Sequence, residues 1–188
     1  MTPATGRGWI PGVPGLVFGL VLASVLIGGW FRLFNDPGTF WHVQLGREIL
    51  ASGSVSSSDA LTFTHRGEHW VDQSWLFDLG LAALVDRSGW STAFVVVALL
   101  LAALYAAVAW DLMGQGRSPL VALAVAVMVA GVGSIHFLVR PHLFTLAFVW
   151  TTLWLCRLQH ERGGWWVAWT IPLTALWANL HGGFLAGP

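Results

Sequence analysis

Three long apolar stretches constrain this chain more than any other feature of its sequence. They run from Val13 to Phe34, from Ser91 to Trp110 and from Pro119 to Leu138, and Arg32 is the single charged residue within them. A helix needs about 20 apolar residues to cross the hydrocarbon core of a bilayer. We therefore expect three membrane-spanning helices. The first is expected to be retained, because no small-residue cleavage site precedes Trp30.

Two shorter apolar stretches follow, from Pro141 to Cys156 and from Trp165 to Leu180, and the second contains Pro172. Segments of this length are compatible with spans that are tilted or kinked, and also with re-entrant segments. Counted as spans, they make the chain an all-α integral membrane protein with about five transmembrane helices.

The composition agrees with a membrane location. The chain is 56% hydrophobic and 10% charged, whereas about a quarter of the residues of a soluble protein are charged. Nine arginines balance nine acids, so the net charge of zero gives no indication of a nucleic-acid partner. Thirteen tryptophans are present, a residue that gathers where a membrane meets water. The single cysteine, Cys156, excludes an internal disulfide.

The spans divide the chain into four parts. These are a short tail (1–12), the first span (13–34), a polar loop (35–89) and a bundle of about four spans (90–188). Arginines are denser in the short segments on the side of the N-terminus, which weakly favours a cytoplasmic N-terminus and an extracytoplasmic loop.

The loop is expected to contain interfacial helices and a small hairpin. Phe40 to Ser52 reads as an amphipathic helix that Gly53 ends. Alternating residues from Leu61 to Val71, with a turn at Arg66 and Gly67, predict a hairpin. Asp72 to Val85 predicts a second helix, which lies along the membrane surface.

Asp36 stands where the first apolar stretch meets this loop, in "NDPGTFWH". An aspartate before a proline is a good helix start, with the aspartate as N-cap and the proline in the first turn. A carboxylate at the mouth of a helix bundle also suits a general base or a ligand for a divalent cation. The sequence leaves both interpretations open.

Four further candidates carry polar side chains at the ends of apolar segments. Arg140 is costly near a membrane unless it reaches water or meets an anion such as phosphate. His142 follows it in "RPHLF", and Asn179 and His181 stand together in "LWANLHGGF". With five full spans, all four fall on the same membrane face as Asp36. His42, two helical turns beyond Asp36, completes the candidate set as a substrate-binding residue.

The stretch "HRGEH", from His65 to His69, matches the H-x-x-E-H pattern of a class of zinc proteases. That pattern works on a helix, where both histidines share one face. Here a glycine stands in its middle and the context predicts a turn. We therefore expect a polar loop tip and assign no metal ligand.

From Asn35 onward the chain resembles bacterial polytopic membrane proteins related to the GT-C glycosyltransferases. That superfamily includes protein O-mannosyltransferases and the catalytic subunits of oligosaccharyltransferases. The resemblance rests on the order of three stretches, "DPGTFWHVQLGREILASGSVSSSDALTFTHRGEHWVDQSWLFD", "RPHLF" and "LWANLHGGF".

The resemblance implies transfer of a sugar from a polyprenyl-phosphate-linked donor to an extracytoplasmic acceptor at the inner (plasma) membrane of a bacterium. It implies that Asp36 is the catalytic base or a ligand for a divalent cation. Many members carry paired acids where this chain has Asp36 followed by Pro37, so a metal requirement stays open. These enzymes also have more than five spans, so we expect this chain to be the N-terminal part of a longer protein. The alternatives are a non-enzymatic membrane scaffold and, less favoured, a transporter.

Overall fold

The structure, a computed structural model, describes residues 12–186, and these residues form helices and no strands. The predicted tail, 1–12, lies outside the described residues except for Gly12. The helices are α1 (Val13–Leu33), α2 (Pro37–Ser52), α3 (Trp75–Gly114), α4 (Pro119–Gly133), α5 (His142–Arg162) and α6 (Thr170–Leu180). Three short 3₁₀ helices complete the set: η1 (Ser134–His136), η2 (Trp166–Trp169) and η3 (Gly182–Ala186).

Three helices are long and apolar enough to span a membrane: α1, α3 and α4 with its extension to His136. At 1.5 Å per residue, the 40 residues of α3 would measure about 60 Å, twice the hydrocarbon thickness. Three of the four charged residues of α3, Asp78, Asp86 and Arg87, precede a break at Gly89, where φ is 79°, and the fourth, Asp111, lies near the end of the helix. The part of α3 after Gly89 is therefore the part that is apolar enough to span a membrane, and the part before it corresponds to the predicted second loop helix.

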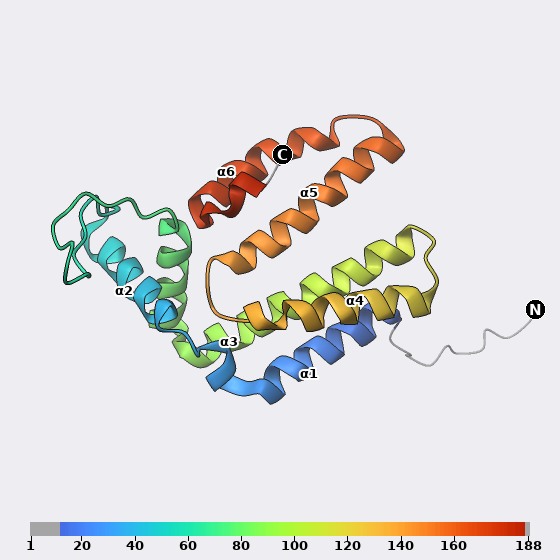
Figure 1. Cartoon of the computed structure of the whole chain (residues 1–188), viewed down its shortest axis with the longest axis horizontal. Coiled ribbons are helices and arrows are strands. Elements are labelled where there is room, and N and C mark those ends of the chain that lie inside the picture. The colour runs from blue at the N-terminus through green and yellow to red at the C-terminus, as the bar shows by residue number, and fades with distance from the viewer. Residues whose placement is uncertain (1–11, 187–188) are drawn as a thin grey trace, which may run out of the picture. The chain divides into compact units, whose positions relative to one another are not determined.

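The two shorter apolar stretches form helices that are not among these three. Helix α5 runs six residues beyond Cys156 into the charged end at Arg162, and α6 has 11 residues, about 16 Å. Helices α5 and α6 lie side by side and run in opposite directions, connected through η2 (Figure 1). The expectation of five full spans thus stays a prediction for these two segments.

The chain divides into two compact units, one formed by residues up to Ile27 with Ala98–Ile135, the other by Gly28–Val97 with the residues from His136 onward. In the first unit, α4 buries alanines one turn apart, Ala122, Ala126 and Ala130. The Tyr105 hydroxyl lies where a side chain at Gly133 would stand. Small residues therefore let α3 and α4 approach closely there.

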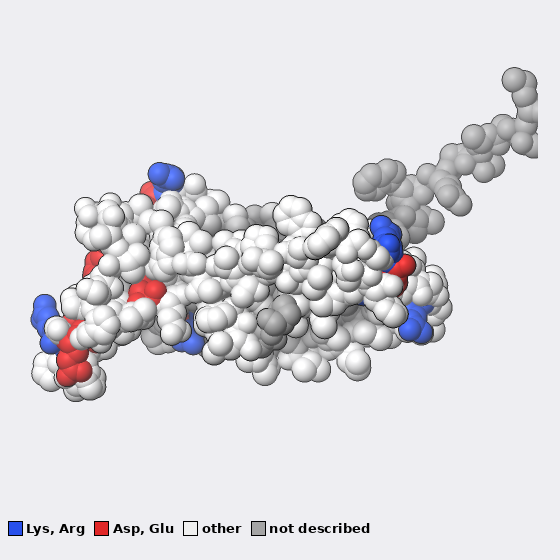
Figure 2. Space-filling model, turned by 90° about the horizontal axis from the view of Figure 1, so that it is seen from above, with Lys and Arg blue, Asp and Glu red and all other residues white. Residues whose placement is uncertain are grey.

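The second unit contains every candidate functional residue. An aromatic cluster links its first elements: the Phe34 and Trp90 rings lie 5.4 Å apart, and the Phe40 and Trp90 rings 5.3 Å apart. Helix α2 approaches α3 closely at Gly46, where a Cβ atom would overlap the backbone carbonyl of Asp78. On the face seen in Figure 2, most of the surface belongs to uncharged residues, which is consistent with contact with a lipid bilayer.

The predicted hairpin from Leu61 to Val71 is wrong. Within the described residues the loop has no strand, and one isolated antiparallel bridge joins Ser58 to His69. The Asp59 carboxylate accepts the N–H groups of Leu61 and Thr62 at 2.9 and 2.8 Å. This side-chain turn uses backbone donors that a strand starting at Leu61 would need.

Candidate functional site

A pocket of about 390 Å³ in the second unit gathers most of the polar residues that the sequence singled out. It is lined by His42, Gln73, Ser74, Arg140, Pro141, His142, His181 and Gly182. Four of the six predicted site residues thus share one pocket, although they come from α2, the segment before α5, the start of α5 and the end of α6.

Asp36 lies next to this pocket and holds Arg140. Its carboxylate accepts the Gly38 N–H at 3.1 Å, as an N-cap does, and Pro37 occupies the first helical position of α2. The same carboxylate receives the Arg140 guanidinium through Nη2 at 2.7 Å and through Nε. The cap interpretation is therefore confirmed, and the ion pair adds a second structural role that the sequence did not indicate.

Two hydrogen bonds to the backbone of Val139, the residue before Arg140, bring Asp36 and Arg140 together. The Val139 N–H donates to the Leu33 carbonyl at 3.1 Å, and the Val139 carbonyl accepts from the buried Thr39 hydroxyl at 2.9 Å. The segment before α5 is thus fastened between the end of α1 and the first turn of α2. The side chain of Arg140 remains 43% exposed, so its guanidinium can meet a ligand as well as Asp36.

His42 is held by a buried acid, Asp78. The ring Nδ1 lies 2.7 Å from Oδ1 of Asp78, whose side chain is fully buried, while His42 is 18% exposed. Burial raises the pKa of Asp78 to about 6, an effect that His42 opposes and the nearby Asp72 reinforces. With its Nδ1 occupied by this acid, His42 faces the pocket with Nε2 as its remaining ring nitrogen.

His142 bonds to the chain just before it. Its Nε2 lies 2.8 Å from the carbonyl of His136, which can only accept, so Nε2 carries a proton. Burial lowers the pKa of His142, and the nearby Arg140 acts in the same direction. A neutral His142 therefore keeps Nδ1 as a proton-free acceptor.

His181 is fixed by α5 and α6 together. Its Nδ1 lies 2.7 Å from the Thr145 hydroxyl and accepts the Gly183 N–H at 3.1 Å. The Thr145 oxygen in turn accepts the indole N–H of the buried Trp177 at 2.9 Å. Burial lowers the pKa of His181, and the neighbouring histidines His142 and His42 lower it further.

Asn179 does not line the pocket. Its Oδ1 accepts the Trp75 indole N–H at 2.8 Å and its Nδ2 donates to the Ala175 carbonyl at 2.7 Å. The oxygen of the amide thereby attaches α6 to the start of α3, and its nitrogen bonds within α6. The predicted substrate contact of Asn179 has no support in this geometry.

Sequence reasoning missed the residues that hold the pocket histidines. Asp78 stands alone among apolar residues in "WLFDLGL", a pattern that marks an acid turned toward a core. That signal was available. Thr145, in the apolar start of α5, had no sequence signal of a role in the pocket. An isolated threonine in such a helix commonly bonds within its own helix.

The histidines of "HRGEH" point to separate partners. His65 Nδ1 lies 2.9 Å from Glu68 and His69 Nδ1 lies 3.1 Å from the Ser57 carbonyl. Among residues 12–186, no three His, Cys, Asp or Glu side chains converge as a metal site requires. Asp36 as a ligand for a divalent cation therefore stays a prediction.

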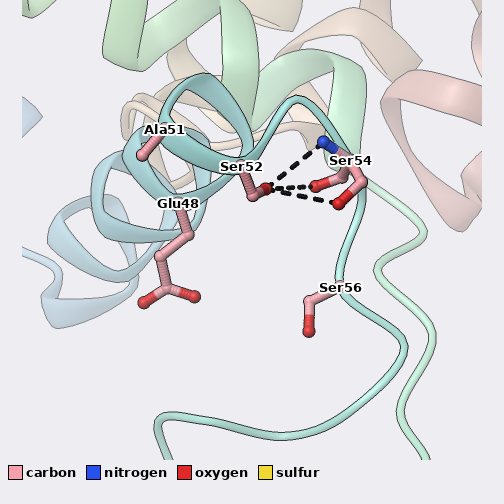
Figure 3. A pocket seen from close by; sticks show the side chains of 5 residues that line it. All are labelled: Glu48, Ala51, Ser52, Ser54 and Ser56. Atoms are coloured by element: carbon pink, nitrogen blue, oxygen red, sulfur yellow. Dashed lines mark hydrogen bonds between the residues drawn. The ribbon is translucent and has the colours of Figure 1, made fainter.

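A second pocket, of about 440 Å³, lies at the end of α2 and is lined by Glu48, Ala51, Ser52, Ser54 and Ser56. The Ser52 hydroxyl donates to the Ser54 carbonyl at 3.0 Å and accepts the Ser54 N–H at 3.2 Å (Figure 3). These bonds belong to a local turn. Fewer charged and titratable side chains meet in this pocket than in the pocket around Arg140.

No protein-family model, curated protein or solved structure matches the chain.

Proposed function

We propose that this protein transfers a sugar from a polyprenyl-phosphate-linked donor to an acceptor hydroxyl at the membrane surface. The observation that carries the proposal is the pocket in which an arginine, held by a carboxylate, stands beside three histidines with assigned partners. A guanidinium pairs well with phosphate oxygens, and the histidines supply neutral donors and acceptors around it.

Arg140 would bind the phosphate of the donor. In the transfer, the acceptor oxygen bonds to the anomeric carbon while the bond from that carbon to the phosphate oxygen breaks. The departing polyprenyl phosphate gains negative charge, which a preorganised guanidinium stabilises. Asp36 keeps Arg140 in place before the donor binds, since its carboxylate holds two of the guanidinium nitrogens.

Two residues can accept the proton that the acceptor hydroxyl releases. Asp36 is the base expected from the sequence, but its oxygens already receive the guanidinium and the Gly38 N–H. His42 lines the pocket and is hydrogen-bonded to a carboxylate through Nδ1, which leaves Nε2 for the substrate. A histidine oriented by a buried acid is a common general base, so we assign this role to His42.

The membrane location suits a donor with a long isoprenoid chain. Three apolar helices are able to contact the bilayer that holds such a chain. The phosphate of this donor would lie at the membrane surface, where Arg140 and the histidines follow or precede apolar segments.

The test follows consumption of lipid-linked sugar in membranes that contain the protein at matched levels. We expect His42→Gln and Arg140→Met each to reduce turnover at least 100-fold, the scale of general-base and charge-stabilisation losses. Arg66→Met, at an exposed loop position, is the matched control and should leave turnover unchanged. Asp36→Asn separates the two candidate bases, because complete loss of turnover there with activity retained in His42→Gln would return the base role to Asp36.

A scaffold function is the second candidate, and one observation favours it. The loop between α2 and α3 presents Phe63 with 98% of its side chain exposed, as a partner-binding residue would be. If wild-type protein consumes no lipid-linked sugar, the scaffold function becomes the better explanation.

A further inference from the structure

The hydrogen bonds around His181 determine which of its ring nitrogens carries the proton. The Gly183 N–H can only donate, and it donates to Nδ1 of His181 at 3.1 Å. A nitrogen that accepts a hydrogen bond has no proton of its own. In the neutral ring the proton of His181 therefore resides on Nε2.

The Thr145 hydroxyl reinforces this assignment. Its oxygen already accepts the indole N–H of Trp177 at 2.9 Å, so its own hydrogen is free to be donated to His181 Nδ1 at 2.7 Å. Two donors then converge on Nδ1. A proton placed on that nitrogen would face both donors, which opposes formation of the charged imidazolium.

Gly183 is required for this arrangement. A Cβ atom there would lie 2.6 Å from the Thr145 hydroxyl oxygen and 2.7 Å from His181 Nδ1. Those separations are far below ordinary contact, so any side chain at 183 would push the hydroxyl and the ring apart. The bare backbone lets the donating N–H come within reach of the ring.

We infer that His181 is a neutral donor at pH 7 that binds a phosphate oxygen of the ligand through Nε2–H, and that Thr145 and Gly183 are positioning residues that fix its tautomer. The inference rests on the proposed function for the identity of the ligand, while the tautomer follows from the hydrogen bonds alone. His181 and Arg140 line the same pocket. A phosphate bound by the Arg140 guanidinium would therefore lie in the pocket that the His181 imidazole also lines.

The other titratable groups of the pocket have different hydrogen-bond partners from those of His181. His42 is bonded to Asp78 and Arg140 to Asp36, so each has a carboxylate that supports a positive charge. No carboxylate is bonded to His181 among the interactions of the described residues; its partners are hydroxyl and amide donors. The pocket thus combines a charged anchor, Arg140, a histidine beside a carboxylate, His42, and two histidines without a carboxylate partner among the described residues, of which His142 donates to the His136 carbonyl and His181 keeps Nε2–H for the ligand.

The experiment uses the whole chain in lipid nanodiscs with ¹⁵N-labelled histidine, and His181→Gln identifies the His181 signals. We expect wild-type His181 at pH 7 to show one neutral tautomer, with the proton on Nε2. Thr145→Val removes one donor to Nδ1 and should raise the titration midpoint of His181 by on the order of one pH unit. Thr145→Ser restores the hydroxyl and should restore the wild-type behaviour.

Thr151→Val is the matched control, since Thr151 lies on the same helix and its hydroxyl donates to the carbonyl of Ala147 at 2.8 Å. It should change neither the tautomer nor binding. A wild-type His181 with its proton on Nδ1, or charged at pH 7, would overturn the inference. So would Thr145→Val and Gly183→Ala variants that fold and leave the His181 signals unchanged.

Binding is measured with three probes: a short-chain isoprenyl phosphate, the corresponding isoprenol, and inorganic phosphate. Thr145→Val and His181→Gln should weaken the isoprenyl phosphate about tenfold, the worth of one hydrogen bond to a charged group. Isoprenol should bind weakly and equally to all variants. Binding of inorganic phosphate alone would identify the ligand as a free phosphate. If no probe binds, the proposed function and the phosphate contact are both overturned, while the tautomer is judged by the ¹⁵N signals.

Discussion

Replacing Gly46 by alanine tests whether the close approach of α2 to α3 holds the His42–Asp78 pair. Gly46 is one helical turn beyond His42 on the same face of α2. A Cβ atom at this position would overlap the backbone carbonyl of Asp78 and the Cβ atom of Ala82. Because a backbone carbonyl cannot rotate away as a side chain can, the two helices would have to separate.

The expected magnitude combines two opposing effects. Overpacking a close contact costs about 1–3 kcal/mol, and alanine gains about 1 kcal/mol over glycine inside a helix. The obstruction is backbone, so the upper end of the cost applies and the free energy of unfolding should fall by about 2 kcal/mol. Gly80→Ala is the matched control: Gly80 is an exposed helical residue of α3 with open space at its Cβ position. It should gain up to about 1 kcal/mol.

The assay is unfolding in mixed detergent micelles, followed by tryptophan fluorescence and helical circular dichroism. A second readout is the ¹⁵N signal of His42, which should lose its hydrogen bond to Asp78 in the Gly46→Ala protein and keep it in the Gly80→Ala protein. If Gly46→Ala is as stable as Gly80→Ala and keeps the His42 hydrogen bond, the close approach does not hold the pair and the reasoning is refuted.

Three further predictions concern buried polar groups. Asp36→Asn keeps an acceptor for the first turn of α2, so Asp36→Ala should unfold with a free energy about 1 kcal/mol lower than Asp36→Asn; equal values would deny the cap any role. Asp78 has a folded-state pKa of about 6 against an ordinary 3.8, so its stabilising contribution, up to about 3 kcal/mol, should be lost as pH rises from 4 through 6. Asp78→Asn should remove this part of the pH profile, and an unchanged profile would assign it to other groups. Thr39→Val should cost about 1–3 kcal/mol because it strands a buried carbonyl 100 residues away, whereas Thr92→Val, whose exposed hydroxyl bonds within its own helix, should cost less than about 0.5 kcal/mol.

Local features of the fold were predictable where the signal is contained in a few neighbouring residues. Asp36 before Pro37 gave the start of α2, and Gly53, with φ of 70°, gave its end. The loop hairpin, predicted from alternation and a turn at Arg66 and Gly67, failed because the Asp59 carboxylate competed for the backbone donors.

The candidate site was predictable only in part. The sequence singled out Arg140, His142 and His181 as polar residues at the ends of apolar segments and His42 as a helix residue two turns beyond Asp36, and the structure brings all four to one pocket. It also included Asn179, which the structure uses to attach α6 to α3. The residues next to them in the sequence do not distinguish a histidine that lines a pocket, such as His181, from an amide that connects two helices, such as that of Asn179.

The sequence by itself determined the presence of the apolar helices and the two ends of α2, because hydropathy and capping act over one or a few helical turns. Only the tertiary structure decided the chemistry of the polar residues. Arg140 meets Asp36 across 104 residues, and Asp78 meets His42 across 36. A side chain's charge, tautomer and availability depend on the partner it meets, and packing between distant segments selects that partner.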